Sequence, residues 1–179
     1  MKNITVFLGS RNAHKDIFKS SVVKLAEAIA KDNHTLVYGG AKVGTMGLLA
    51  DTALEHGAKV IGIMPKVLSD KEIIHPHLTE TILVKDMHER KLKLQNEGDM
   101  FVAMPGGCGT MEEIFEVITW HQIGVHHKPY CFMNIDGFYD GIRSYLVNAQ
   151  SQNFISKENL NHIHFFDSIE ELVNSDLWI

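Results

Sequence analysis

The sequence predicts an α/β protein in which helices cover both faces of a mostly parallel sheet. Short apolar runs rich in β-branched residues alternate with longer segments of helical periodicity along the 179 residues. Several short runs are apolar at every position, as expected for strands that are covered on both faces. Two glycine-rich stretches each follow a strand and enter a helix. Together these observations indicate a three-layer Rossmann-like fold.

The strands and helices alternate in order. Strand character is found at residues 4–8, 35–38, 59–64, 81–84, 100–103 and 130–135, and helical periodicity at 18–31, 46–56, 87–97, 111–123 and 139–150. Residues 163–166 and 169–173 add an edge strand and a closing helix. The segment 65–79, which includes His75-Pro76-His77, has no periodicity and is expected to form a loop over the site. The length favours a single domain over residues 1–179.

Composition excludes several classes of protein. The net charge is −5 with both signs mixed along the chain, so no basic stripe for a nucleic acid is present. Cys108 and Cys131 form no CxxC pair, and no apolar run approaches the 18 residues of a membrane span. Residues 1–3 lead directly into the first strand without a signal peptide. We therefore expect a cytoplasmic protein without a membrane or nucleic-acid partner.

The most informative segment is residues 105–113, Pro-Gly-Gly-Cys-Gly-Thr-Met-Glu-Glu. It follows an apolar strand and enters a helix. Gly106, Gly107 and Gly109 let the backbone approach a ligand, and the first N–H groups of the helix have no partner within the helix. The segment therefore predicts an anion site at a helix N-terminus.

The same segment offers two interpretations of its last glutamate. Thr110 is expected as the N-cap, and Glu113 three residues later completes the spacing of a capping box. On that interpretation Glu113 does no chemistry. On the other, the glycines place a carboxylate beside a bound anion.

Four strand ends are expected to meet at one rim, because the carboxyl ends of parallel strands lie at the same edge. Gly9-Ser10-Arg11 follows the first strand, Gly39-Gly40 follows the second, and residues 86–91 and 105–113 follow two others. This indicates a mononucleotide pocket, although tight turns alone would also use such glycines. The spacing is not Gly-x-Gly-x-x-Gly and no Gly-Lys-Ser/Thr occurs, which disfavours NAD and nucleoside triphosphates.

The helix 87–97 carries two cations at unusual positions. On a 3.6-residue period Met87 and Leu94 share a face, and Arg90 and Lys91 lie between them. The cations either reach out to solvent or line the pocket, where a guanidinium matches a phosphate. Opposite Glu113, Arg90 would hold the carboxylate in its ionised form.

These motifs resemble the LOG ("lonely guy") family of cytokinin riboside 5'-monophosphate phosphoribohydrolases. The resemblance rests on Pro-Gly-Gly-x-Gly-Thr-x-x-Glu and Met-His-x-Arg-Lys, and it extends from Gly9-Ser10 to residues 136–139. It implies a Rossmann-like homodimer that cleaves the N-glycosidic bond of a purine nucleoside 5'-monophosphate without a cofactor. Arg90 and Glu113 would be catalytic. Substrate or phosphate contacts would fall on Gly106, Gly107, Gly109, Thr110, Lys91, Thr119, Ser10, Gly39, Gly40 and Met87.

Some features leave alternatives open. Ala41 and Thr45 depart from the family's usual glycine and leucine. At the start of a helix Glu113 is expected to stay ionised and to stabilise positive charge. The proton for the departing purine base would then come from another group, and His88 is a candidate.

Two other functions, a carrier and a lysine decarboxylase, are alternatives for this sequence. A non-catalytic nucleotide or cofactor carrier would use the same glycines. A lysine decarboxylase would need a pyridoxal phosphate lysine, and Lys15 follows His14 but lacks the serine two residues before that histidine, where Asn12 stands. The histidines have no zinc spacing, so no metal is expected.

Overall fold

The computed structural model describes residues 1–69 and 74–179. Its described residues form a seven-stranded sheet in the order β4-β3-β2-β1-β5-β6-β7, and every neighbouring pair is parallel. The strands are β1 Asn3–Phe7, β2 Thr35–Tyr38, β3 Lys59–Pro65, β4 Glu80–Val84, β5 Met100–Ala103, β6 Tyr130–Met133 and β7 His164–Phe166. The predicted α/β fold is confirmed.

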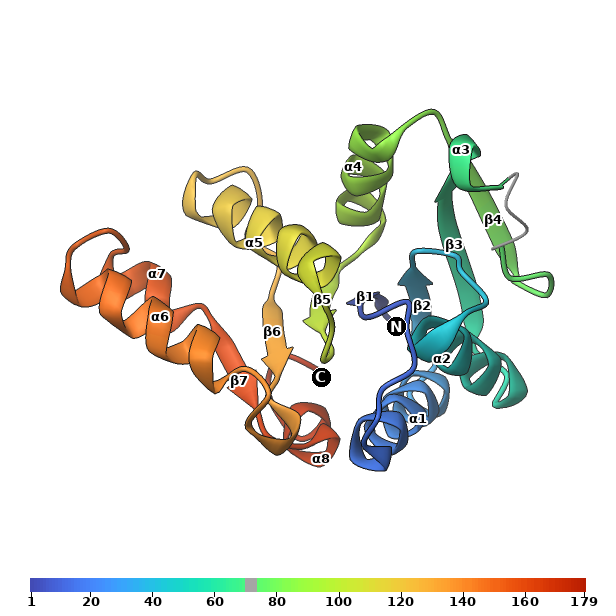
Figure 1. Cartoon of the computed structure of the whole chain (residues 1–179), viewed down its shortest axis with the longest axis horizontal. Helices are drawn as coiled ribbons and strands as arrows, with labels where there is room; N and C mark the ends of the chain where they lie inside the picture. Colours follow the sequence, from blue (N-terminus) through green and yellow to red (C-terminus); the bar gives the residue numbers. More distant parts are fainter. Residues whose placement is uncertain (70–73) are drawn as a thin grey trace.

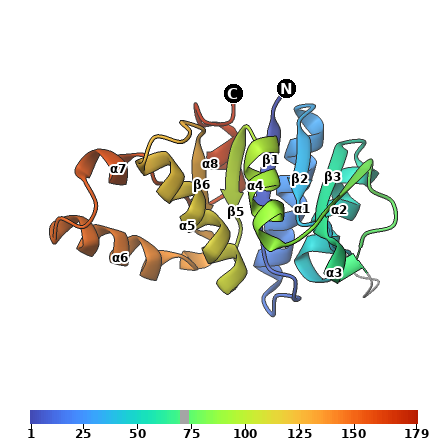
Figure 2. The same ribbon diagram turned by 90° about the horizontal axis from the view of Figure 1, so that it is seen from above.

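Helices cover both faces of this sheet (Figure 1). They are α1 Asp16–Lys31, α2 Gly44–Glu55, α3 Lys66–Ser69, α4 Met87–Glu97, α5 Cys108–Gln122, α6 Asp140–Ser151, α7 Lys157–Asn161 and α8 Ile169–Val173, with a 3₁₀ turn η1 at Ile135–Gly137. Helices α1, α2 and α8 lie on one face and α4, α5 and α6 on the other. Seen from above, α6 and α7 stand at one end of the molecule and α3 at the other (Figure 2).

Two apolar cores explain why the strands have no polar face. In β1, Ile4 and Val6 pack into the core under α1, α2 and α8, whereas Phe7 packs into the core under α4 and α5. Successive side chains of a strand point to opposite faces, so a strand covered on both faces needs apolar residues throughout. This is the pattern that the sequence shows.

Most predicted elements agree with the structure to within a few residues, and the differences have physical causes. The short helices α3 and α7 were not expected, because four or five residues give little periodicity. Strand β6 ends at Met133 rather than at Ile135, since Asp136 adopts a left-handed conformation (φ 54°) inside η1. Helix α5 begins at Cys108, three residues earlier than predicted.

The sheet order places a topological switch at β1. Strand β1 lies between β2 and β5, and the connections after β1 and β5 diverge toward opposite faces of the sheet. The two connections touch at glycines: a Cβ on Gly106 would stand 3.1 Å from the backbone nitrogen of Gly9. The glycine-rich turns therefore converge where ligands bind in open α/β sheets.

Candidate functional site

A cavity of about 710 Å³ opens beside the carboxyl ends of β1, β2, β3 and β5. Its wall combines the ends of these strands with the first turn of α5 and with one side chain from α4. The polar groups are Ser10, Arg11, Arg90, Cys108, Thr110 and Glu113. Apolar surface comes from residues that include Ala41, Val43, Met46 and Met64. A mostly apolar pocket with a few convergent polar groups is the usual form of a small-molecule site.

Arg90 is held in the wall of this cavity by acceptors from three elements. Its Nε donates to the carbonyl of Ile63 at 3.0 Å, its Nη1 lies 3.3 Å from Oε1 of Glu113, and its Nη2 lies 3.5 Å from the carbonyl of Gly39. The side chain is 12% exposed. The cation therefore points inward and does not reach out to solvent, which decides between the two predicted orientations.

Gly39 makes room for this arginine. A Cβ at this position would stand 2.1 Å from Nη2 of Arg90 and 2.6 Å from the methyl group of Met46. Neither distance is compatible with ordinary packing, so any larger residue would push the guanidinium or the methionine aside. A glycine is therefore needed at position 39, because the side chains of Arg90 and Met46 leave no space for a Cβ.

Glu113 faces Arg90 across the strand ends, as predicted, but its ionisation differs from the prediction. Its side chain is only 13% exposed, and burial raises the pKa of its carboxyl to about 7 even though Arg90 opposes that shift. The sequence indicated an ionised carboxylate at the start of a helix. With a pKa of about 7 the carboxyl is instead partly protonated at neutral pH, because burial outweighs Arg90 and because Glu113, the sixth residue of α5, lies beyond the first turn where the helix dipole acts.

The N-terminus of α5, which we call the cradle, lies where the sequence predicted an anion site. Gly107 is the N-cap residue, and the first helical residues that follow it are Cys108, Gly109 and Thr110. The N–H groups of the first turn lack intrahelical partners and point toward the cavity end of the helix. Gly107 and Gly109 have open space where a Cβ would lie.

The predicted capping box was wrong, because the helix begins earlier than the spacing suggested. Thr110 is the third residue of α5 and is buried, and the N-cap position makes no side-chain cap bond. Its hydroxyl instead packs against the backbone of the preceding turn, since a Cβ on Gly106 would stand 2.2 Å from Oγ1 of Thr110. Gly106 is therefore required by the close packing of this turn.

Several residues named from the family resemblance lie away from the cavity wall. Lys91 pairs with Glu112 at 2.7 Å and with Glu116 at 3.2 Å, and the Thr119 hydroxyl donates to the carbonyl of Phe115 at 2.7 Å. Met87 is 41% exposed at the start of α4. Their assignment to substrate binding stays a prediction.

Gly40 has a backbone role beside the site. It adopts a left-handed conformation (φ 80°), and its carbonyl accepts a hydrogen bond from the backbone N–H of His75 at 2.9 Å. The imidazole of His75 bonds to Asp51 at 2.8 Å. This contact fastens residues 74–77 to the turn after β2. The predicted loop at 65–79 also contains α3 and, at 70–73, residues outside those described.

The structure adds contacts that the sequence gave no means of finding. The carbonyl of Ile63, which holds Arg90, is a backbone group and leaves no trace in residue type.

His88, a candidate proton donor, is exposed on α4 and lines neither of the two cavities. Among the described residues no cluster of histidine, cysteine or carboxylate side chains could hold a metal ion, and no helix is long and apolar enough to cross a membrane.

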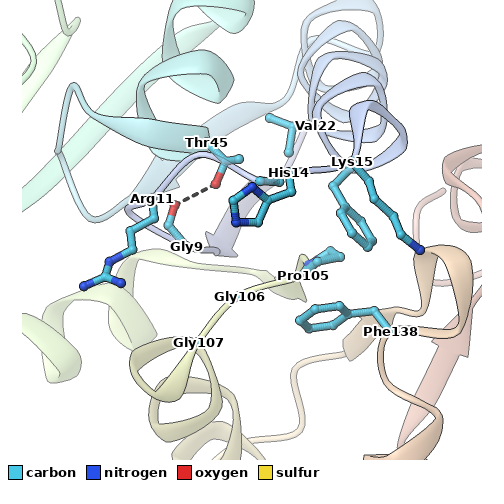
Figure 3. A pocket seen from close by; sticks show the side chains of 12 residues that line it. Gly9, Arg11, His14, Lys15, Val22, Thr45, Pro105, Gly106, Gly107 and Phe138 are labelled. Carbon is cyan, nitrogen blue, oxygen red and sulfur yellow. Dashed lines mark hydrogen bonds between the residues drawn. The ribbon is translucent and has the colours of Figure 1, made fainter.

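A second cavity of about 420 Å³ lies on the other side of the glycine turns (Figure 3). It shares Gly9, Arg11 and Gly107 with the first cavity. Its remaining wall comes mainly from the turn after β1, from α1, from the turn after β5 and from Phe138, which follows η1. The two cavities thus meet at the cradle.

Comparisons with known proteins point to one family. A family model described as "possible lysine decarboxylase" matches residues 46–175. The chain is 41% identical over 155 residues to the cytokinin riboside 5'-monophosphate phosphoribohydrolase LOG2 of Arabidopsis thaliana, an alignment that covers 87% of this chain and 73% of the relative. It is 39% identical over 173 residues to the probable enzyme LOGL3 of Oryza sativa subsp. japonica, covering 97% and 82%.

Solved structures share the fold at lower identity. The protein TM1055 has a TM-score of 0.76 with 24% identity, covering 97% of this chain and 96% of its own. The Moco carrier protein of Chlamydomonas reinhardtii has a TM-score of 0.70 with 17% identity, covering 96% and 93%. At these identities the similarity concerns the fold alone.

Proposed function

Since the chain belongs to the LOG family of cytokinin riboside 5'-monophosphate phosphoribohydrolases, we propose that it is a hydrolase of nucleoside 5'-monophosphates. It cleaves the N-glycosidic bond of a purine nucleotide and releases the free base and ribose 5-phosphate. Water adds across the bond between C1′ and the base, so no cofactor is needed. The observation that carries the proposal is the buried pair of Arg90 and Glu113 beside the anion cradle of α5.

In the proposed complex, the 5'-phosphate binds at the N-terminus of α5. The backbone N–H groups of Gly107, Cys108, Gly109 and Thr110 offer donors there, and the helix dipole favours an anion. Glu113 is six residues beyond Gly107, about 9 Å along the helix axis. A phosphate at the cradle therefore leaves the ribose ring to extend toward Glu113.

Glu113 acts on the sugar in its ionised form. Cleavage of a glycosidic bond builds positive charge on the ring, and a carboxylate in a water-poor cavity stabilises such charge strongly. Arg90 is permanently charged, so it cannot serve as a proton donor. It orients the carboxylate through Nη1 and keeps part of the Glu113 population ionised near neutral pH.

Further parts of the proposal rest on the family resemblance. Ser10, Gly39, Gly40, Gly106, Met87, Lys91 and Thr119 complete the substrate site. The resemblance also makes the protein a homodimer. Composition and length are the grounds for a cytoplasmic protein without nucleic-acid or membrane partners in which residues 1–179 act as one domain.

The test is release of free base from two substrates. Purified protein is incubated with AMP and separately with isopentenyladenosine 5'-monophosphate, and the base is followed by chromatography. We expect release by the native chain and a loss of 100-fold or more in Glu113→Gln and in Arg90→Ala. Full base release by Glu113→Gln would refute the role of this carboxylate.

A carrier function is the second candidate, because the same cradle could hold a nucleotide without turnover. It would require the glycines but not the buried ion pair. Tight binding of AMP with no base release from either substrate would favour the carrier. The names of the curated relatives, which are hydrolases, support the enzyme.

A further inference from the structure

The cavity behind the glycine turns has the walls of a site for a flat apolar group. Pro105, Ala13 and Val22 contribute aliphatic surface, and Phe18 and Phe138 meet edge to face with their ring centres 5.6 Å apart. We call this cavity the aromatic chamber; besides these five residues, the polar side chains of His14, Lys15 and Thr45 also line it. Its volume of about 420 Å³ lies within the usual range of small-molecule pockets, roughly 300–1,000 Å³.

The aromatic chamber is continuous with the proposed phosphate cradle. Gly9, Arg11 and Gly107 line both cavities, and Gly107 is the N-cap residue of α5. In Figure 3, Pro105 lies between His14 and Phe138, and Gly106 and Gly107 run from the chamber toward the start of α5. A ligand anchored at the cradle can therefore extend in two directions.

The direction of the sugar decides which part of a ligand enters the chamber. Glu113 and Arg90 line only the first cavity, and they lie beyond the cradle along α5. The ribose and its base extend to that side in the proposed complex. The chamber lies on the opposite side of the phosphate, so its occupant is a group attached to the phosphate itself.

Arg11 supplies a charge at the junction. Within residues 1–69 and 74–179 its guanidinium has no hydrogen bond or ion pair, although it lines both cavities. Figure 3 shows it extending away from the aromatic end, on the other side of the Gly9 turn from Phe138. A planar guanidinium with free donors suits a second phosphate group next to the first.

We propose that the site accepts nucleotides extended at their 5'-phosphate, namely dinucleotides joined by a pyrophosphate, with the second base in the aromatic chamber. A dinucleotide held in this way does not use the Gly-x-Gly-x-x-Gly turn whose absence disfavours a Rossmann-type NAD site. The proposal rests on the proposed function for the position of the first phosphate. It adds a substrate class in which the Phe18–Phe138 pair contacts the second base and Arg11, which lines both cavities, is the cation beside the pyrophosphate. Contacts between aromatic side chains and a base do not depend on the hydrogen-bonding groups of the base, so any base can make them.

Equilibrium binding of diadenosine 5',5'-diphosphate and of AMP tests this inference. We expect the dinucleotide to bind at least tenfold more tightly than AMP. Ala13→Trp, which fills the chamber, and Phe138→Ala, which removes one wall, should each abolish most of that advantage and leave AMP binding within twofold. Phe154→Ala removes an aromatic ring that is 85% exposed and lines neither cavity, so it serves as the matched control.

The outcomes separate this inference from the proposed function. Equal affinity for the two ligands, or an advantage that survives both chamber variants, would overturn the inference even while base is released from AMP. A chamber-dependent advantage without any base release would support the inference and refute the hydrolase. Phe138 is 44% exposed, so its truncation tests the chamber even where Ala13→Trp does not fold.

Discussion

The two arginines at the strand ends differ in how firmly the protein holds them. Arg90 donates to a carbonyl of β3, lies near a carbonyl of the turn after β2 and faces the Glu113 carboxylate. Arg11 has no such partner among the residues described and stays exposed in the turn after β1. One cation is fixed before substrate arrives, whereas the other is free to adapt.

The difference matches what each side of the glycine turns would have to do. Stabilising a developing charge requires groups that are already in place, because reorganisation during the reaction is costly. Binding a variable extension of the substrate requires no such rigidity. The side of the site with Glu113 is therefore suited to chemistry and the side with Arg11 to recognition.

Substitution of Gly39 should have the largest effect, because it displaces the fixed arginine directly. In Gly39→Ala the new methyl group would meet Nη2 of Arg90 at 2.1 Å. We expect base release to fall about 100-fold, since small displacements of catalytic groups are costly. Gly141→Ala, at a position with open space in α6, is the matched control. Unchanged activity in Gly39→Ala would show that the position of Arg90 is not critical.

The pH dependence of the free energy of unfolding should show how much the ionised, buried Glu113 carboxylate destabilises the folded protein. Between about pH 4.5 and pH 7 the unfolded chain loses the Glu113 proton while the folded protein keeps it, so this group lowers stability as pH rises. Glu113→Gln resembles the protonated form at every pH. We therefore expect the variant to be more stable than the native chain at pH 8, by about 3 kcal/mol, and nearly equal at pH 4.5.

Urea unfolding at the two pH values measures this difference. The informative quantity is how the difference in the free energy of unfolding between variant and native chain changes with pH. All other groups titrate alike in the two proteins and cancel from this difference. A difference that is constant with pH would mean that the pKa of Glu113 is not raised. A native chain that is more stable than the variant at pH 8, with the difference vanishing at low pH, would mean that Arg90 outweighs burial.

The sequence could predict which residues meet but not the balance of forces on them. Arg90 and Glu113 were expected to face each other because both follow strands whose carboxyl ends share one edge. The raised pKa of Glu113 was not foreseeable, since it depends on how completely α4, α5 and the strand ends exclude water. Helix α5 begins earlier than predicted because its first residues, Cys108, Gly109 and Thr110, carry no periodic apolar signal.

Contacts through the backbone were likewise hidden from the sequence. The carbonyl of Ile63 positions Arg90, and Phe138 reaches the aromatic chamber only because η1 turns the chain at Asp136. By contrast, the fold class followed directly from strands that are apolar on both faces. Patterns repeated along many residues are predictable, whereas single contacts between distant segments are not.

The pH dependence of catalysis should be smaller than the effect of Gly39→Ala. If ionised Glu113 is the active form, kcat/KM for AMP rises about tenfold between pH 6 and pH 8, because the pKa of the carboxyl is about 7. The substrate phosphate also titrates near pH 6, so the residual activity of Glu113→Gln is measured over the same range as a control. A rate that falls with rising pH would instead make Glu113 the proton donor.

The smallest effects on the pH profile should come from two charges that flank Glu113. Lys91 lowers the pKa of Glu113 and Glu112 raises it, and the two side chains pair with each other at 2.7 Å. We therefore expect Lys91→Met to move the midpoint of the rate profile to higher pH and Glu112→Gln to move it to lower pH. Neither change alters the fixed hydrogen bonds of Arg90. Opposite shifts of the midpoint would show that Glu113 is the titrating group, whereas shifts in the same direction would point to a rearrangement of α4 against α5.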